Sequence, residues 1–178
     1  MSIVLETPRL KLRPIAAEDF EPYAAMMAAP AVARFLTLDG APQSRANAWR
    51  AFASLVGHWT IRGYGMFSMI EKASGRWVGR AGPWNPEGWP QIECGWGVAP
   101  EFWGKGYAPE AATAAIDWTF AARPELVRII SLIAAANANS QAVARKIGER
   151  NTGEIFMIEH VAVEIWAVSR EDWRAARC

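Results

Sequence analysis

The stretch Trp103-Gly104-Lys105-Gly106-Tyr107-Ala108 places two glycines between a predicted strand and a predicted helix. The strand covers Gln91 to Val98, and the alanine-rich helix covers Pro109 to Ala121. Glycine lets the backbone turn its N–H groups toward a ligand at close range. The N-terminus of the helix adds partial positive charge, so this turn is predicted to bind an anion, most simply a phosphate group.

The composition is that of a globular protein, and we expect one domain over residues 1–178. Hydrophobic residues make up 52% and charged residues 21% of the chain, which is not the signature of disorder. The formal net charge of +1 gives no electrostatic reason to expect nucleic acid or an anionic membrane as a partner. No apolar run approaches the roughly 20 residues that span a bilayer, and we expect no signal peptide at Met1-Ser2-Ile3.

The two cysteines, Cys94 and Cys178, form no metal-binding or redox motif. Cys94 lies in a predicted strand and Cys178 is the last residue, so we expect no structural disulfide. A reducing, cytoplasmic setting fits this cysteine usage. His58 and His160 lack metal-ligand spacing with any other His, Cys or acid, so both are expected to be structural and no metal is predicted. A monomer and a homodimer both fit the sequence.

Hydrophobic periodicity and the positions of Gly and Pro predict an α+β fold, with mixed α/β layers around a central sheet. The predicted strands are Leu10 to Pro14, Met66 to Glu71, Trp77 to Gly82, Gln91 to Val98, Leu126 to Ala134, Ile155 to Ile158 and His160 to Val168. The predicted helices are Phe20 to Met27 (stopped by Pro30), Ser44 to Gly63, Pro109 to Ala121, Asn137 to Gly148 and Arg170 to Ala176. A loop is predicted at Pro83 to Pro90.

Trp103 to Ala108 resembles motif A of the GNAT superfamily, the acyl-CoA-dependent N-acyltransferases. The longer run Gly95 to Ala111 is similar to the branch that acetylates ribosomal-protein N-termini. Asn137-Ala138-Asn139-Ser140, followed by Arg145 to Gly148, resembles the second signature of that branch, and Thr7-Pro8-Arg9-Leu10 resembles its opening strand. This resemblance covers nearly the whole chain. It implies a GNAT-like domain whose largely antiparallel central sheet has a splayed strand pair and helices on both faces.

The resemblance implies acetyl-CoA as co-substrate, with the pyrophosphate of coenzyme A on backbone N–H groups of the glycine turn. Trp103 replaces the usual Gln or Arg of the family, and Pro109 contributes no N–H. The alternative is that the glycine turn is only structural. The residues implied to contact coenzyme A are Gly97, Val98, Trp103, Gly104, Lys105, Gly106, Tyr107, Ala108, Asn137 and Ser140.

Two of these contacts have specific roles in the family. Gly97 and Val98 are implied to lie where the strand pair splays, and the Val98 N–H is expected to stabilise the charge that develops on the thioester oxygen. The alternative for this pair is a β-bulge without a ligand. Asn137 is implied to hydrogen-bond the pantetheine amide, and an Asx turn is the rival interpretation.

Amine acylation needs a neutral amine, a base that takes its proton and an acid that protonates the leaving thiolate. Glu93 is the candidate base because it precedes Gly95 by two residues on the strand that leads to the site, and a surface carboxylate is the alternative. Ser140 is the candidate acid or thiol contact, and its alternative is helix N-capping, which Asn139 could also fill. The tyrosine that many relatives use as the acid is replaced by Ala144.

Residues and resemblance together predict an enzyme that transfers an acetyl group from acetyl-CoA to a primary amine, by direct attack in a ternary complex. The acceptor is a protein N-terminus or a small-molecule amine, and Trp84 and Trp89 are candidate walls of its site, with plain loop packing as the alternative. A non-catalytic acyl-CoA-binding or sensing module is the rival function. A nucleotide-phosphate binder is disfavoured because the motif Gly-x-x-x-x-Gly-Lys-Ser/Thr is absent from the sequence.

Overall fold

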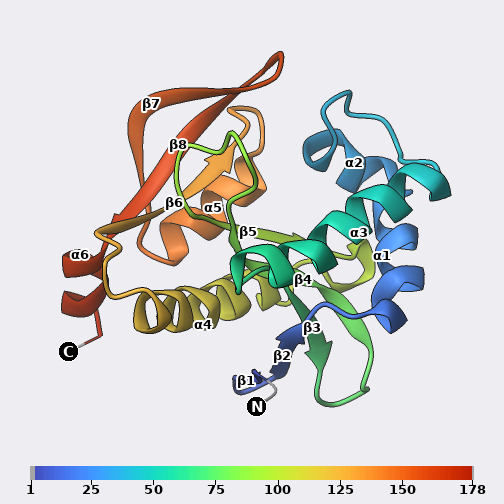
Figure 1. Cartoon of the computed structure of the whole chain (residues 1–178), viewed down its shortest axis with the longest axis horizontal. Coiled ribbons are helices and arrows are strands. Elements are labelled where there is room, and N and C mark those ends of the chain that lie inside the picture. Colours follow the sequence, from blue (N-terminus) through green and yellow to red (C-terminus); the bar gives the residue numbers. More distant parts are fainter. Residues whose placement is uncertain (1–2, 178) are drawn as a thin grey trace.

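A computed structural model describes residues 3–177, which form an eight-stranded sheet with helices on both faces (Figure 1). The strand order is β1-β2-β3-β4-β5-β6-β8-β7, and every neighbouring pair is antiparallel except β5 and β6. The strands are β1 (Leu5–Glu6), β2 (Leu10–Pro14), β3 (Phe67–Glu71), β4 (Trp77–Trp84), β5 (Glu93–Val98), β6 (Arg128–Ile133), β7 (Arg150–Ile158) and β8 (Val161–Ser169). The helices are α1 (Phe20–Met27), α2 (Pro30–Leu36), α3 (Arg45–Arg62), α4 (Tyr107–Ala122), α5 (Ala138–Lys146) and α6 (Arg170–Ala175), with 3-10 turns η1 (Ala17–Asp19) and η2 (Pro100–Phe102). The predicted α+β fold with a largely antiparallel sheet is confirmed.

Helix α4 packs closely on one face of the sheet because three of the side chains in the middle of its buried face are alanines. Ala111, Ala112 and Ala115 are fully buried, and the Cys94 thiol of β5 lies 3.9 Å from the Ala112 carbonyl. The opposite face carries α1 and α2, where a Cβ atom on Gly97 would lie only 3.1 Å from Leu36 Cδ1. Glycine on β5 therefore lets α2 approach the sheet closely.

The ends of α3 follow the sequence prediction, whereas α2 was missed. Ser44 caps α3 by accepting a hydrogen bond from the Asn47 N–H (3.2 Å), and Gly63 ends it in the left-handed conformation with φ of 75°. Pro30 was expected only to stop α1, but it also begins α2 after an extended Ala29. Proline suits the first position of a helix because its missing N–H has no partner there in any case.

Strand β4 is longer than predicted, because Pro83 and Trp84 belong to it and not to the following loop. Pro83 lies opposite Cys94 of β5, while pairing with β3 on the other side ends at Ala81. A proline is tolerated in a strand where its missing donor faces no partner strand. The two-residue strand β1 was also not predicted.

Cys178 lies outside the described residues, so the absence of a disulfide between it and Cys94 stays a prediction. Between residues 3 and 177, none of the helices combines the length and the apolar character needed to cross a membrane.

Among residues 3–177, β5 and β6 form the one parallel strand pair, and this pair has the fewest paired residues in the sheet. Its register consists of one pair, Glu93 opposite Ile130, although both strands run six residues. Beyond that pair β6 follows β8 over its whole length, and β5 follows β4 from Glu93 to Val98. The two halves of the sheet therefore part after Glu93 and leave a gap between β5 and β6, as the splayed strand pair implied.

A buried carboxylate ties the first helix to the sheet on the face opposite α4. Asp19 is 2% exposed and accepts hydrogen bonds from both Arg13 amino groups (2.7 and 2.8 Å). It also accepts from the Ser68 hydroxyl (2.6 Å) and the Ala16 N–H (2.9 Å). The cluster joins β2, β3 and the start of α1, so it fixes the helix whose later residues reach the central cavity described below.

We predict that Asp19→Asn destabilises the fold by about 3–5 kcal/mol, because the Arg13 guanidinium keeps its charge but loses its buried anionic partner. Urea unfolding followed by circular dichroism measures this change. Glu21→Gln is the control, since it removes a carboxylate from the exposed Glu21–Arg45 pair and should leave the midpoint almost unchanged. Equal midpoints for the two variants would show that the Asp19 cluster does not anchor α1.

Candidate active site

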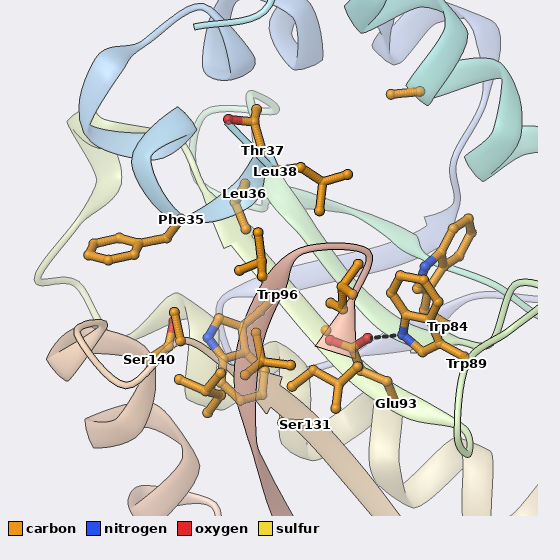
Figure 2. A pocket seen from close by; sticks show the side chains of 18 of the residues that line it. Phe35, Leu36, Thr37, Leu38, Trp84, Trp89, Glu93, Trp96, Ser131 and Ser140 are labelled. Atoms are coloured by element: carbon orange, nitrogen blue, oxygen red, sulfur yellow. Dashed lines mark hydrogen bonds between the residues drawn. The ribbon is translucent and has the colours of Figure 1, made fainter. Parts of the chain in front are cut away.

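A cavity of about 890 Å³ lies where the gap between β5 and β6 opens toward α2, α3 and the β7–β8 hairpin (Figure 2). Most of its walls are aromatic or aliphatic, with a few polar groups among them. The residues that bear on function here are Arg80, Trp84, Trp89, Glu93, Trp96, Ser131, Asn137 and Ser140. The structure thus brings the predicted residues Glu93, Asn137 and Ser140 to one cavity. Trp84 and Trp89 also line it, as the sequence suggested.

Glu93 is half-buried in this cavity and is not a surface carboxylate. Its Oε2 accepts a hydrogen bond from the Trp89 indole N–H at 2.6 Å, which Figure 2 shows. Burial raises the pKa of Glu93, while the Trp89 hydrogen bond and the positive charge of Arg80 oppose that rise. A carboxyl with a raised pKa in a cavity fits a general base, because its conjugate acid holds a proton closer to neutral pH.

The backbone of β5 presents free N–H groups to the gap. The N–H and C=O of one strand residue point to the same side, and successive residues alternate. The Cys94 carbonyl accepts a hydrogen bond from the Ser131 hydroxyl of β6 (2.9 Å), so even-numbered residues of β5 face β6. Trp96 and Val98 have the same orientation, but β6 has already moved away from them. Pairing of β5 with β4 is continuous, so no β-bulge interrupts the strand.

The predicted anion-binding turn lies at the far end of this gap. Gly104 and Gly106 have φ of 75° and 77°, which suits glycine, and α4 begins at Tyr107. The first N–H groups of a helix have no partner within it, so those of Tyr107 and Ala108 are available to an anion. Pro109 is the third helical residue and supplies none.

Side chains around the turn fix it to the sheet. The exposed Trp103 donates its indole N–H to the Val98 carbonyl (2.7 Å), and Tyr107 donates its hydroxyl to Glu71. Lys105 accepts a hydrogen bond at its carbonyl from Arg9 (2.7 Å) and lies with its ammonium 3.9 Å from Glu71. The turn is therefore connected to the ends of β5 and β3 and to the residue that precedes β2.

Arg9 is a residue at this turn whose role the sequence did not reveal. Its guanidinium lies over the Tyr107 ring and forms an ion pair with Glu110 at 2.6 Å. Thr7 donates its hydroxyl to the same carboxylate (2.7 Å). The signal was present in the Thr7-Pro8-Arg9-Leu10 resemblance, but without the fold nothing placed this strand beside the start of α4.

Asn137 and Ser140 lie at the start of α5, where the side chain of Asn137 takes part in the turn. Asn137 is the cap residue, and its Oδ1 accepts a hydrogen bond from the Ser140 N–H at 3.2 Å. The Asx-type interpretation of Asn137 is therefore confirmed, and neither Ser140 nor Asn139 caps the helix. Ser140 is left with its side chain in the cavity wall.

The position of the missing tyrosine lies in a small apolar cluster. Ala144 is fully buried with Ile133 and Trp166, and Trp96 packs against this cluster. Figure 2 shows the Trp96 side chain next to Ser140. The indole of β5 therefore lies between this cluster and the cavity that Trp96 lines.

His58 has a structural role, as predicted. Its Nδ1 lies 2.7 Å from the Tyr64 carbonyl, and its Nε2 accepts from the Asn85 N–H at 3.2 Å. Both ring nitrogens are therefore engaged in a neutral imidazole that stacks on Trp84. Over residues 3–177, no group of three or more His, Cys, Asp or Glu side chains is placed to hold a metal ion.

The comparisons with known proteins agree with this geometry. The family model described as an acetyltransferase (GNAT) domain matches residues 9–150. An acetyltransferase from Agrobacterium tumefaciens is 30% identical, with a TM-score of 0.82 over 96% of both chains. A ribosomal L7/L12 alpha-N-protein acetyltransferase in complex with coenzyme A shares the fold at 17% identity, with a TM-score of 0.74 over 94% of this chain and 98% of that one.

An uncharacterised protein of Bacillus subtilis, YkkB, is 37% identical over 91 residues. That match spans 49% of this chain and about half, 52%, of the relative's length. The family model covers most of the chain, and the Agrobacterium structure matches nearly all of it. The chain therefore belongs to the GNAT family of acetyltransferases.

Proposed function

We propose that this chain transfers an acetyl group from acetyl-CoA to a primary amine, by direct attack of the amine in a ternary complex. One observation carries the proposal: beyond Glu93, which lines the cavity, β5 has no backbone pairing with β6 as far as Val98, beside which the glycine turn lies. Strand β5 thus runs from the cavity to the turn, which suits a long ligand with a reactive end and an anionic end. The related ribosomal-protein enzyme was solved with coenzyme A bound.

In this proposal the pyrophosphate lies on the N–H groups from Gly104 to Ala108, and the pantetheine arm follows β5. The arm pairs with β5 in the place that β6 leaves free. Asn137 remains available to the pantetheine amide, because its Oδ1 keeps a second lone pair beside the one that accepts from Ser140, and its amide N–H₂ can donate.

The chemistry follows from the groups around the gap. The neutral amine attacks the thioester carbon, and the Val98 N–H stabilises the negative charge that develops on the carbonyl oxygen. Glu93 accepts the proton that the amine loses as the C–N bond forms. The C–S bond then breaks, and the thiolate takes a proton from solvent water, for which the Ser140 hydroxyl in the cavity wall is the candidate relay, giving its own proton as it receives another.

The acceptor is a protein N-terminus or a small-molecule amine. The cavity is large enough for either, and the tip of the β7–β8 hairpin forms one of its walls through Phe156 to Glu159. A cytoplasmic setting and a monomeric or homodimeric state belong to the same proposal.

A non-catalytic acyl-CoA-binding module is the second candidate, because position 144, where many relatives carry the tyrosine acid, is a fully buried alanine. The two are separated by thiol release from acetyl-CoA in the presence of a panel of amines and peptides. Acceptor-dependent release supports the transferase, and tight binding without release on any acceptor supports the module.

We predict that Glu93→Gln lowers kcat about a hundredfold near neutral pH, since the amide cannot accept the proton of the amine. The loss should shrink at high pH, where the amine is already neutral. In the unchanged protein, turnover should rise with pH through the raised pKa of Glu93, because the carboxyl accepts a proton only once ionised. The control is Glu125→Gln, which alters an exposed carboxylate that does not line the cavity and should leave kcat unchanged. A pH–rate profile that Glu93→Gln leaves unchanged would refute the role of Glu93 as base.

A second prediction concerns the glycine turn. Gly104→Asp should raise the Kd for coenzyme A about a hundredfold, because it sets a carboxylate beside the pyrophosphate. Gly104→Asn is the matched control: Asn has the same shape, tolerates the left-handed conformation and has open space around Gly104, so most of the affinity should remain. Isothermal titration calorimetry measures both. Equal affinities for the Asp and Asn variants would place the pyrophosphate elsewhere.

A further inference from the structure

A buried glutamate that the proposed chemistry does not use lies beneath the cavity. Glu149 follows α5 and precedes β7, and it is 2% exposed. Its Oε1 lies 2.9 Å from the Ser131 hydroxyl of β6. Its Oε2 is buried, and within the described part of the chain it has no hydrogen-bond partner. An ionised carboxylate with a bare buried oxygen is costly, whereas a neutral acid in the same place is much less so.

The number of protons available around Ser131 also indicates that Glu149 is neutral. The Ser131 oxygen lies 2.9 Å from the Cys94 carbonyl and 2.9 Å from Glu149 Oε1, but the hydroxyl has only one proton. The carbonyl can only accept, so the hydroxyl donates to Cys94. The contact with Glu149 is then a hydrogen bond only if the carboxyl supplies the proton. Both contacts are satisfied together when Glu149 is a carboxylic acid that donates to Ser131.

The surroundings of Glu149 favour this neutral form. Burial is the main cause that raises its pKa from 4.5 to about 8, the charge of Glu93 on β5 adds to the rise, and the Ser131 hydrogen bond opposes it. Cys94 is the other titratable group facing it from β5, and the pKa of that thiol is also raised well above its usual range by burial. From α5, the Ala144 carbonyl accepts a hydrogen bond from the Glu149 N–H at 2.9 Å.

This acid–hydroxyl–carbonyl chain lies at the point where the sheet divides. Cys94 and Ser131 are each one residue beyond Glu93 and Ile130, the last backbone pair between β5 and β6. The Ser131 side chain therefore bridges the two strands at the first step after their backbones part. We propose that Glu149, held as a neutral acid, fixes the angle of this fork through Ser131 and is thus a positioning residue for the acyl-transfer site. The positioning role rests on the proposed function.

Ionisation of Glu149 should loosen the fork. A carboxylate can only accept, so it would draw the Ser131 proton to itself and leave the Cys94 carbonyl without a donor. Acetyl-CoA affinity is then expected to fall as the pH rises past the pKa of Glu149, about 8. Glu149→Gln keeps a donor toward Ser131 at every pH and should not show this fall.

The protonation state is tested by the pH dependence of folding stability. In the unfolded chain Glu149 loses its proton above its usual pKa of 4.5, whereas in the folded chain it keeps the proton up to about pH 8. Folding stability therefore falls as the pH rises between these two pKa values. Relative to Glu149→Gln, the unchanged protein should lose about a factor of ten in its folding equilibrium constant per pH unit between pH ~5.5 and ~7.5. The exposed Glu125→Gln is the control and should keep the steeper slope. Equal slopes for the unchanged protein and Glu149→Gln would show that Glu149 is ionised and overturn the proposal.

The positioning role is tested by acetyl-CoA titration of the unchanged protein, Glu149→Gln and Ser131→Ala. Ser131→Ala should bind roughly tenfold more weakly at pH 7 and lose the alkaline fall in affinity. If Ser131→Ala bound and turned over acetyl-CoA like the unchanged protein, the fork would not depend on this chain and the positioning role would be wrong. If the unchanged protein bound no acetyl-CoA, the proposed function and the positioning role would both fail. The stability slopes would still decide the protonation of Glu149.

Discussion

The single backbone pair between β5 and β6, Glu93 opposite Ile130, is the constraint on which the site depends. A parallel pair requires a crossover connection, and here that crossover is the glycine turn followed by α4. The same segment that separates the strands therefore carries the predicted anion-binding N–H groups. Because β6 turns to follow β8, the outer edge of β5 is left without a backbone partner, and an extended ligand can take the place of a strand there.

Two side-chain arrangements hold the gap open and shape it. Trp96 packs against the apolar cluster that contains Ala144, so α5 contributes Ser140 to the cavity wall and no tyrosine. Ser131 joins the strands at the fork, and the buried Glu149 stands behind it. If the proposed function is correct, the proton that the thiolate takes comes by way of Ser140 or water, because position 144 has no tyrosine. The bridge of Ser131 and Glu149 makes the geometry of the acyl-transfer site depend on the carboxyl of Glu149, which does not contact the substrate.

The sequence predicted most elements of the fold because hydrophobic periodicity, caps and glycines are local signals. Ser44 and Gly63 marked the ends of α3, and the small residues of α4 marked the face that meets the sheet. The family resemblance added the splayed pair and the turn. The burial of Glu149 and the position of Trp96 were not predictable, because both follow from how β5 and β6 diverge, which is a long-range property. Helix α2 was missed because Pro30 is a local signal with two meanings: a proline that ends one helix also suits the start of the next.

A crystal structure of the protein with acetyl-CoA would locate the thioester relative to β5. We expect the pantetheine arm to lie in the gap between β5 and β6. The thioester oxygen should lie about 2.7–3.2 Å from the Val98 nitrogen, the range of an N–H···O hydrogen bond. A thioester bound outside the gap, or β5 and β6 paired along their length in the complex, would contradict it.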